Sequence, residues 1–485
     1  MKSMMVFDWS TRNKKSAEGQ RRPFGHLLNI SIYCCVVVGI LLYQSSNVSV
    51  TVAASYSCIS ALVCTTIAFA NKDGGRSWLF WFTFIYFVFF QLGTVIAAVL
   101  LVYDDTLLNY ATNFSNYLST DSIAKSYIAS GLCIALIWTL SALFYRKRVG
   151  AVTNLGFDLN LYKVAYFLLV FTFPPVLVDL VDQFRLVSSY GYSFFYTSSF
   201  QDRESIVPAM GIIRTLNTLG FYMFFAAMPD RRRFSWGAGF FLLVAVLDSM
   251  KGARSALIVP LCFITWHAIT YYGLKVRIGR GAVLLSLALG FLIFMSIARS
   301  DSGSDTFMLT RFFTIGLSKA QYTLAVVLEN YNHIEVKSIF ALEPVIFPIK
   351  YMLYGGDLVG QSESTAILRQ DLNHTFSSQL NFGAYLSGAG IGSNFVAEAL
   401  QFGPVYMPVF LTIWWVSIRF FFKYSKNYRT IFFIQPIVFI HLISSPRASI
   451  FPSTWPIIKL LSLFLVVKVI IWFLSKLPKH NRLFG

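Results

Sequence analysis

The sequence predicts an all-α polytopic membrane protein with about twelve transmembrane helices and one large external loop. Three observations support this class. Of the 485 residues, 56% are hydrophobic and 17% are aromatic, which is typical of an integral membrane protein. Apolar runs alternate with short polar connections through most of the chain. Between residues 299 and 402 this alternation stops, and mixed residues replace the apolar runs.

The apolar runs define the predicted spans, because a transmembrane helix needs about 20 mainly apolar residues. These runs cover roughly residues 26–44, 50–70, 78–102, 126–145, 161–181, 209–228, 235–250, 255–273, 282–298, 404–422, 430–444 and 455–474. The predicted organisation is therefore helices 1–9 in residues 1–298, the large loop in residues 299–402, and helices 10–12 in residues 403–485.

The formal charge of +18 is explained by the orientation of these spans. Lysine and arginine gather in alternate connections, as the positive-inside rule requires of cytoplasmic loops. The clusters are Arg12–Lys15, Arg21–Arg22, Lys72 with Arg76, Arg146–Arg148, Arg231–Arg233, Lys275–Arg280, Lys423–Arg429 and Lys476–Arg482. This pattern places both termini in the cytoplasm and the large loop outside. Outside these clusters the sequence has no lysine- and arginine-rich tail and no basic stripe with interleaved aromatic residues. We therefore expect no nucleic-acid partner.

Cysteine and histidine give no sign of a metal or cofactor. All six cysteines lie in apolar runs without metal-ligand spacing, so they are expected to be small core residues. The six histidines are scattered along the chain. We therefore expect no metal and no cofactor.

The loop of residues 299–402 is predicted to be the working part of the protein. Long loops in compact folds are usually functional or disordered, and this one holds aromatic and aliphatic residues throughout. In Thr310–Asn330, apolar residues recur at helical spacing, which predicts an amphipathic helix lying on the membrane face. Gly316 weakens that helix.

Basic residues near the outer ends of spans are the first candidate site. Lys251 and Arg254 lie at the outer ends of two spans, where ionisable groups are costly and mark functional sites. Arginine can bind a phosphate with two parallel hydrogen bonds, and lysine acts as a point charge, so the pair suits a diphosphate. The alternative is that both side chains extend to the interface. Arg299 and Arg311 are further candidates for substrate binding, although Asp301 and Asp305 offer simple neutralisation of the first.

A glycine-rich segment closes the loop. Residues 388–403 read GAGIGSNFVAEALQFG, and a helix after the glycines would direct backbone N–H groups toward an anion. In such a helix Asn394, Glu398 and Gln401 would share one face. Glu398 is a candidate general base or sugar-binding carboxylate, and Asn394 a candidate substrate-binding residue. The alternative for Glu398 is an ion pair with one of the arginines.

His374 is the other candidate base, since histidine has a pKa suited to taking a proton from a hydroxyl. The alternative is a solvated loop histidine. Arg203 and Arg447 face outward by topology and are candidates for a positive cavity, with an interfacial role as the alternative. The aromatic segment Tyr190–Tyr196 is expected to anchor the chain at the membrane interface.

The chain resembles the O-antigen (Wzy-type) polysaccharide polymerases of bacterial inner membranes. The resemblance rests on the many-span plan, on KGARS at 251–255, and on GSNFVAEALQFG at 392–403. It implies a lipid-linked glycosyltransferase of the GT-C type that uses no nucleotide sugar and no metal. Its substrates would be undecaprenyl-diphosphate-linked oligosaccharide repeat units at the periplasmic face, with membrane lipid and a chain-length regulator protein as further partners.

The resemblance also implies roles for the candidate residues. Arg254, with Arg299 or Arg311, would bind the diphosphate leaving group, and Glu398 or His374 would deprotonate the acceptor hydroxyl. The aromatic segment Tyr190–Tyr196 would pack on sugar faces, with anchoring at the interface as the alternative. Two other functions remain open at this point. One is an O-antigen ligase, and the other is a flippase for lipid-linked oligosaccharide, although no internal repeat of the kind that many transporters show is visible.

Overall fold

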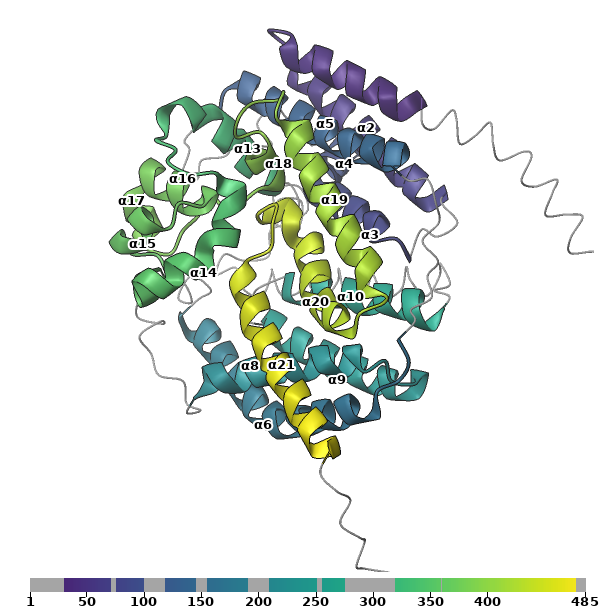
Figure 1. The fold of residues 1–485 in the computed structure, drawn as a ribbon. Helices are drawn as coiled ribbons and strands as arrows, with labels where there is room; N and C mark the ends of the chain where they lie inside the picture. Colours follow the sequence, from purple (N-terminus) through teal and green to yellow (C-terminus); the bar gives the residue numbers. More distant parts are fainter. Residues whose placement is uncertain are drawn as a thin grey trace, which may run out of the picture.

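The computed structural model describes residues 30–70, 76–99, 118–144, 155–190, 209–250, 255–274, 319–358 and 360–476 (Figure 1). These residues form helices and turns, and no strand occurs among them. The first helix covers Ile30–Gln44. The others are α2 (Val50–Ala70), α3 (Trp78–Phe90), α4 (Leu92–Val99), α5 (Thr120–Phe144), α6 (Leu159–Tyr190), α8 (Met210–Ala226), α9 (Arg231–Met250), α10 (Ser255–Tyr272), α13 (Lys319–Asn330), η4 (Tyr331–His333), η5 (Phe340–Leu342), α14 (Glu343–Tyr354), η6 (Gly355–Leu358), α15 (Glu363–Leu368), α16 (Leu372–Leu380), α17 (Phe382–Leu386), α18 (Phe395–Ala399), α19 (Met407–Ser425), α20 (Arg429–Ser444), η7 (Ser445–Arg447) and α21 (Thr454–Lys476).

The described helices coincide with the predicted apolar runs, and the run at 282–298 lies outside the described residues. Six of these helices are long and apolar enough to cross a membrane, and shorter apolar helices occupy three further runs. The all-α, multi-pass class is confirmed for the part of the chain that the structure describes. The number of twelve spans stays a prediction.

Two predicted spans differ in detail from the helices observed. The run at 78–102 is divided at Gln91 into α3 and α4, and the Gln91 side chain donates to Ser57 Oγ at 3.1 Å. The run at 161–181 is only part of α6, which continues to Tyr190 and contains Pro174 and Pro175. Apolar composition marks where a chain can cross the bilayer, whereas such polar contacts and helix extensions depend on neighbouring helices.

Small residues bring α2 and α5 together. Ser57 Oγ and Ser130 Oγ share a hydrogen bond of 2.9 Å, and the Tyr86 hydroxyl donates to the Ser130 carbonyl at 2.7 Å. Gly131 lies beside them, where a Cβ atom would come within 2.7 Å of the Tyr56 ring and 3.0 Å of the Ser57 Cα. Close backbone approach through small residues is how helices associate in membranes.

Replacing Gly131 with valine should therefore destabilise the bundle. The added methyl groups meet a backbone atom that cannot move aside without separating α2 from α5, and overpacking of this kind costs about 1–3 kcal/mol. A thermal unfolding scan of the detergent-purified protein should show a lower midpoint. Gly156→Ala is the matched control, because a Cβ there meets nothing within 4 Å. Equal midpoints for Gly131→Val and the wild type would contradict this packing.

The sequence predicts an amphipathic surface helix over residues 310–330, of which residues 310–318 lie outside the described residues. The remainder forms α13, which is not a surface helix. Its residues 320–327 are all buried, and the helix packs on α5, α3 and α18. Gln321 donates to Ser126 Oγ of α5 at 2.7 Å, and Ser119, just before α5, donates its backbone N–H to Glu329 at 3.0 Å. The helical spacing of apolar residues correctly predicted a helix here. Other helices also cover the face of α13 that was expected to be exposed to solvent. The described part of the long loop therefore begins inside the bundle.

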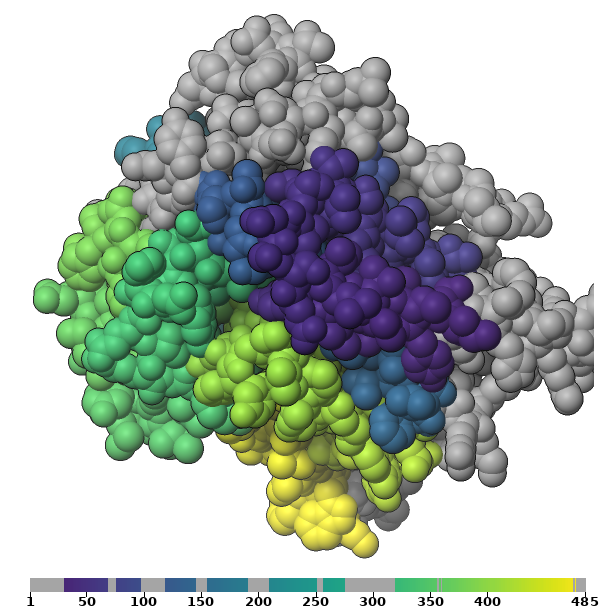
Figure 2. Space-filling model, turned by 90° about the horizontal axis from the view of Figure 1, so that it is seen from above, coloured from purple at the N-terminus to yellow at the C-terminus, as the bar shows by residue number. Residues whose placement is uncertain are grey.

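The later loop helices lie together on one side of the molecule. Figure 1 shows α14, α15, α16 and α17 grouped beside α18, and α14 packs against α21. In Figure 2 the green loop helices occupy one side of the visible face, next to the lime and purple surfaces of later and earlier helices. This arrangement brings the loop next to the turn between α20 and α21, where the candidate site lies.

Candidate active site

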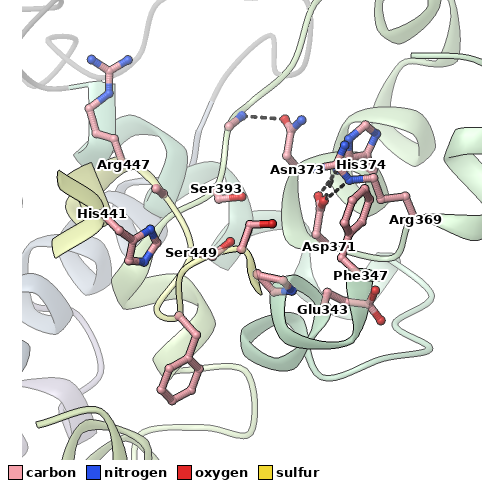
Figure 3. A pocket seen from close by; sticks show the side chains of 15 residues that line it. Glu343, Phe347, Arg369, Asp371, Asn373, His374, Ser393, His441, Arg447 and Ser449 are labelled. Carbon is pink, nitrogen blue, oxygen red and sulfur yellow. Dashed lines mark hydrogen bonds and ion pairs between the residues drawn. The ribbon is translucent and has the colours of Figure 1, made fainter. Parts of the chain in front are cut away.

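A polar cavity of about 340 Å³ lies between the loop helices and the segment that joins α20 to α21 (Figure 3). This size is within the range of sites for small molecules, about 300–1,000 Å³. The lining residues are Glu343, Pro344, Phe347, Arg369, Asp371, Asn373, His374, Gly392, Ser393, His441, Arg447, Ala448, Ser449, Phe451 and Ser453. Two arginines, two histidines and two carboxylates thus surround a space that also holds hydroxyl and amide groups.

Arg369, Asp371 and His374 form one unit at the start of α16. Asp371 is the N-cap residue of that helix, because its side chain accepts from the His374 backbone N–H at 3.0 Å. Its other oxygen accepts from Arg369 Nε at 2.9 Å, and the guanidinium lies over the Phe347 ring at 5.1 Å. A guanidinium fixed through Nε and one face can direct its terminal amino groups toward an anion.

His374 is nearly buried and lines the cavity. Its Nδ1 shares a 2.7 Å hydrogen bond with the Tyr385 hydroxyl, and its Nε2 lies 3.9 Å from Asp371. Burial lowers the pKa of His374 below 6.5, so the ring is neutral at pH 7. In the tautomer in which Nδ1–H donates to Tyr385, Nε2 is free to accept a proton, and Asp371 would then stabilise the imidazolium. This geometry meets the requirements for a general base, namely a free ring nitrogen and a group that stabilises the protonated ring.

The opposite wall includes residues 448–453, and Glu398 and His441 both contact its backbone at Ile450. The Ile450 N–H donates to Glu398 Oε2 at 2.8 Å, and His441 Nε2 lies 3.4 Å from the Ile450 carbonyl oxygen. Arg447 begins this wall, with its guanidinium 5.3 Å from the centre of the Phe89 ring. In Figure 3 Arg447 and His441 lie on one side of the cavity and Arg369, Asp371 and His374 on the other.

Glu398 differs from the catalytic base that the sequence suggested. It is fully buried and does not line the cavity. Burial raises its pKa to about 8, against hydrogen bonds from the Ile450 N–H and the Ser449 hydroxyl. A carboxyl that is protonated at pH 7 is a poor proton acceptor. Glu398 also has no ion pair with an arginine among the described residues. Its contacts make it a positioning residue for the wall.

The raised pKa predicts a pH-dependent stability. Folding takes up a proton at Glu398 between pH 4.5 and about 8, so the free energy of unfolding should fall as the pH rises through that window. The slope contributed by one group is at most about 1.4 kcal/mol per pH unit. Glu398→Gln should remove this contribution in thermal scans from pH 5 to 8, while the exposed control Glu335→Gln should keep it. A wild-type slope retained in Glu398→Gln would contradict the assignment.

In the glycine-rich segment, two of the backbone N–H groups are hydrogen-bonded within the loop. Gly392 donates to Asn373 Oδ1 at 2.8 Å, and Ile391 donates to Ser377 Oγ at 3.0 Å. A Cβ at Gly390 would lie 2.6 Å from Asn373 Oδ1, so a larger residue there would displace this side chain. Side chains of the loop therefore accept from two of the donors that the sequence suggested for a ligand.

Asn394 and Gln401 also contact protein groups. Asn394 is the N-cap residue of α18: its Oδ1 accepts from Val396 and Ala397, and its Nδ2 donates to the Ala320 carbonyl at 2.7 Å. Gln401 accepts from the Phe340 N–H at 2.8 Å. Both are buried, so their hydrogen bonds hold the loop to itself and to α13. These contacts do not support the substrate-binding role predicted for Asn394.

The predicted basic candidates Lys251, Arg254, Arg299, Arg311 and Arg203 lie outside the described residues. Sequence reasoning missed two lining residues whose signals were visible in the printed sequence. His441 is an ionisable residue in an apolar run, which is a functional signal by itself. Arg369 lies two residues before Asp371, so a basic, an acidic and an imidazole side chain lie close together in the sequence at this point.

A family comparison identifies the protein class. The sequence model of a family described as O-antigen polysaccharide polymerase Wzy matches residues 27–482, nearly the whole chain. The chain belongs to the Wzy family. This confirms the resemblance found in the sequence. No curated protein and no solved structure matches the chain.

Membership in the Wzy family assigns the chain, at the level of the family, to O-antigen polysaccharide polymerisation, a reaction of the glycosyltransferase type. The apolar helices agree with a multi-pass membrane protein, and the family is one of the bacterial inner membrane. The match spans both the loop helices and the helices around them, so the polar cavity lies within the matched region.

Proposed function

We propose that this Wzy family member polymerises undecaprenyl-diphosphate-linked oligosaccharide repeat units at the periplasmic face of the inner membrane, with the polar cavity as its active site. The observation that carries the proposal is that Arg369, His374 and Arg447 all line one cavity. Anion-binding and proton-accepting groups are what transfer from a lipid diphosphate to a sugar hydroxyl requires.

The proposed reaction forms one glycosidic bond. The acceptor hydroxyl oxygen attacks the anomeric carbon of the donor sugar, and the bond from that carbon to the lipid diphosphate oxygen breaks. The electron pair leaves with undecaprenyl diphosphate, whose charge Arg369 and Arg447 stabilise. His374 Nε2 takes the hydroxyl proton. Asn373, Ser393 and Ser449 offer polar groups to sugar hydroxyls. Lys251, Arg254, Arg299, Arg311 and Arg203 remain proposed as further diphosphate contacts.

The predicted topology supports the periplasmic side. Charge bias places both the loop of residues 299–402 and the turn between α20 and α21 outside, and these two segments line the same cavity. We extend the proposal to twelve spans of the GT-C type with both termini in the cytoplasm, the large loop as a unit of its own, and a chain-length regulator protein as partner.

The test is reconstitution with a defined substrate. The purified chain should convert an undecaprenyl-diphosphate-linked repeat unit into a ladder of longer lipid-linked glycans and release undecaprenyl diphosphate. Transport of labelled lipid-linked oligosaccharide across liposomes without chain growth would point to a flippase. In cells, deletion of the gene should remove lipid-linked polymer, whereas loss of a ligase would leave that polymer intact.

A further inference from the structure

A second cavity, the basic–aromatic pocket, lies between α3, α10 and α19 and has a volume of about 100 Å³. Its basic residues are Arg76, Arg419, Lys423 and Lys426. Its aromatic walls include Trp266 and Trp415. The volume allows several water molecules or one phosphate group, but not an oligosaccharide. This pocket shares no residue with the polar cavity.

One arginine of the basic–aromatic pocket is fixed in place. Arg419 Nη1 donates to the Phe144 carbonyl at 2.5 Å, and the guanidinium lies 4.9 Å from the centre of the Trp415 ring. Lys423 follows one helical turn later and lies over the Tyr424 ring at 5.5 Å. A guanidinium that is already ordered loses little side-chain entropy when it binds an anion.

Two buried polar groups in this pocket lack a hydrogen-bond partner in the described structure. Trp415 is 2% exposed and its Nε1–H has no acceptor, and Thr270 is 7% exposed and its Oγ1 has no partner. Leaving a buried donor unsatisfied costs about 1–3 kcal/mol. Both residues line the pocket, where a bound anion would bring hydrogen-bond acceptors close to these two side chains.

The basic–aromatic pocket lies at the opposite end of α3 from the polar cavity. Trp78, in the first turn of α3, lines the pocket, whereas Phe89, near its end, contacts Arg447 of the polar cavity. Eleven residues of helix separate these positions by roughly 16 Å. Arg76 lies just before α3 and Lys423 in the last turn of α19, and charge bias places both of these helix ends on the cytoplasmic side. The pocket therefore lies at headgroup level in the inner leaflet.

We propose that the basic–aromatic pocket binds the phosphate of an anionic glycerophospholipid. Basic pockets between transmembrane helices on the cytoplasmic side suit such headgroups. Two exposed apolar side chains of α19, Ile413 and Phe420, offer a surface on which the acyl chains can pack. A lipid fits this setting better than free phosphate, because free phosphate has no acyl chains to pack on the apolar surface. The proposal is independent of the polymerase reaction.

Thermal unfolding of the full-length protein in nanodiscs tests this proposal. Discs of phosphatidylcholine with 20 mol% phosphatidylglycerol, about one lipid in five, should raise the unfolding midpoint by several degrees over phosphatidylcholine alone. The shift should shrink in high salt. Thr270→Val, which keeps the side-chain shape, and the double variant Arg419→Gln, Lys423→Gln should each lose at least half of it. The charge-matched control Lys163→Gln, Arg232→Gln changes two exposed basic residues outside the pocket and should keep it.

Two further measurements decide between sources of the phosphate. Native mass spectrometry of the detergent-extracted wild type should show retained phosphatidylglycerol, which needs no variant to fold. Inorganic phosphate added to phosphatidylcholine discs should not reproduce the shift. Equal midpoints in the two disc compositions, a full shift in the Thr270→Val and double variants, or a full effect of inorganic phosphate would each overturn the lipid site.

Discussion

Replacing His374 with alanine should abolish polymer and leave the protein folded in the membrane. The ring nitrogen is the proposed acceptor of the hydroxyl proton, and general-base catalysis contributes about 10²–10⁴-fold to a rate. We expect chain growth from a defined lipid-linked repeat unit to fall at least about 100-fold. In a strain without the chromosomal copy, the long-chain ladder should disappear.

The matched control for His374 is His333→Ala, an exposed histidine in the same loop that does not line the cavity. It should keep wild-type chain growth. The pH profile adds a second readout: because burial lowers the pKa of His374, the rate should fall at a more acidic pH than for a base that is a solvated histidine. Unchanged polymer in His374→Ala would remove His374 from the reaction.

Replacing Arg369 with alanine should cause the second large loss. The guanidinium borders the cavity from a position fixed by Asp371 and Phe347, where it would stabilise charge on the leaving diphosphate. Removing one such preorganised donor typically costs about 10²–10³ in rate. Arg369→Lys should recover part of the rate, because lysine keeps the charge and loses the planar fork. Chain growth by the purified variants measures both effects.

Lys337→Ala is the control for this arginine, since Lys337 is an exposed basic residue of the same loop whose side chain pairs with Glu335 at 3.3 Å. It should grow polymer at the wild-type rate. Arg369→Ala also releases Asp371, so its thermal midpoint must be measured alongside its rate. Wild-type chain growth in Arg369→Ala would rule out a role for this side chain in the reaction.

The fold was largely predictable because bilayer thickness imposes a length on each apolar run. Helices α2 and α20 begin and end within one residue of the predicted runs. Burial of both faces of α13 was not predictable, since its partner Ser126 lies almost 200 positions earlier in the chain. Hydrophobic spacing reports the face that a helix must bury, but it does not report what covers the other face.

The candidate site was predictable in part. His374 was found from its chemistry, and it lines the cavity. Glu398 was found on the same ground, but its chemistry depends on burial behind Ile450, which no local pattern reveals. Asn394 resembled a ligand-binding residue because a helix N-cap and a binding site favour the same side chains. Tertiary contacts decide between those uses.

The insertion of α13 into the bundle has a consequence for exchanging parts between members of the family. Gln321 and Glu329 hydrogen-bond to Ser126 and Ser119, so the stem of the loop and α5 form one interlocking pair. A chimera that transplants only residues 319–402 would place foreign side chains against those serines. Transplants that alter sugar preference should carry α5 with the loop, or keep α13 and exchange only α14 to α17, which lie apart from α5 along one side of the protein.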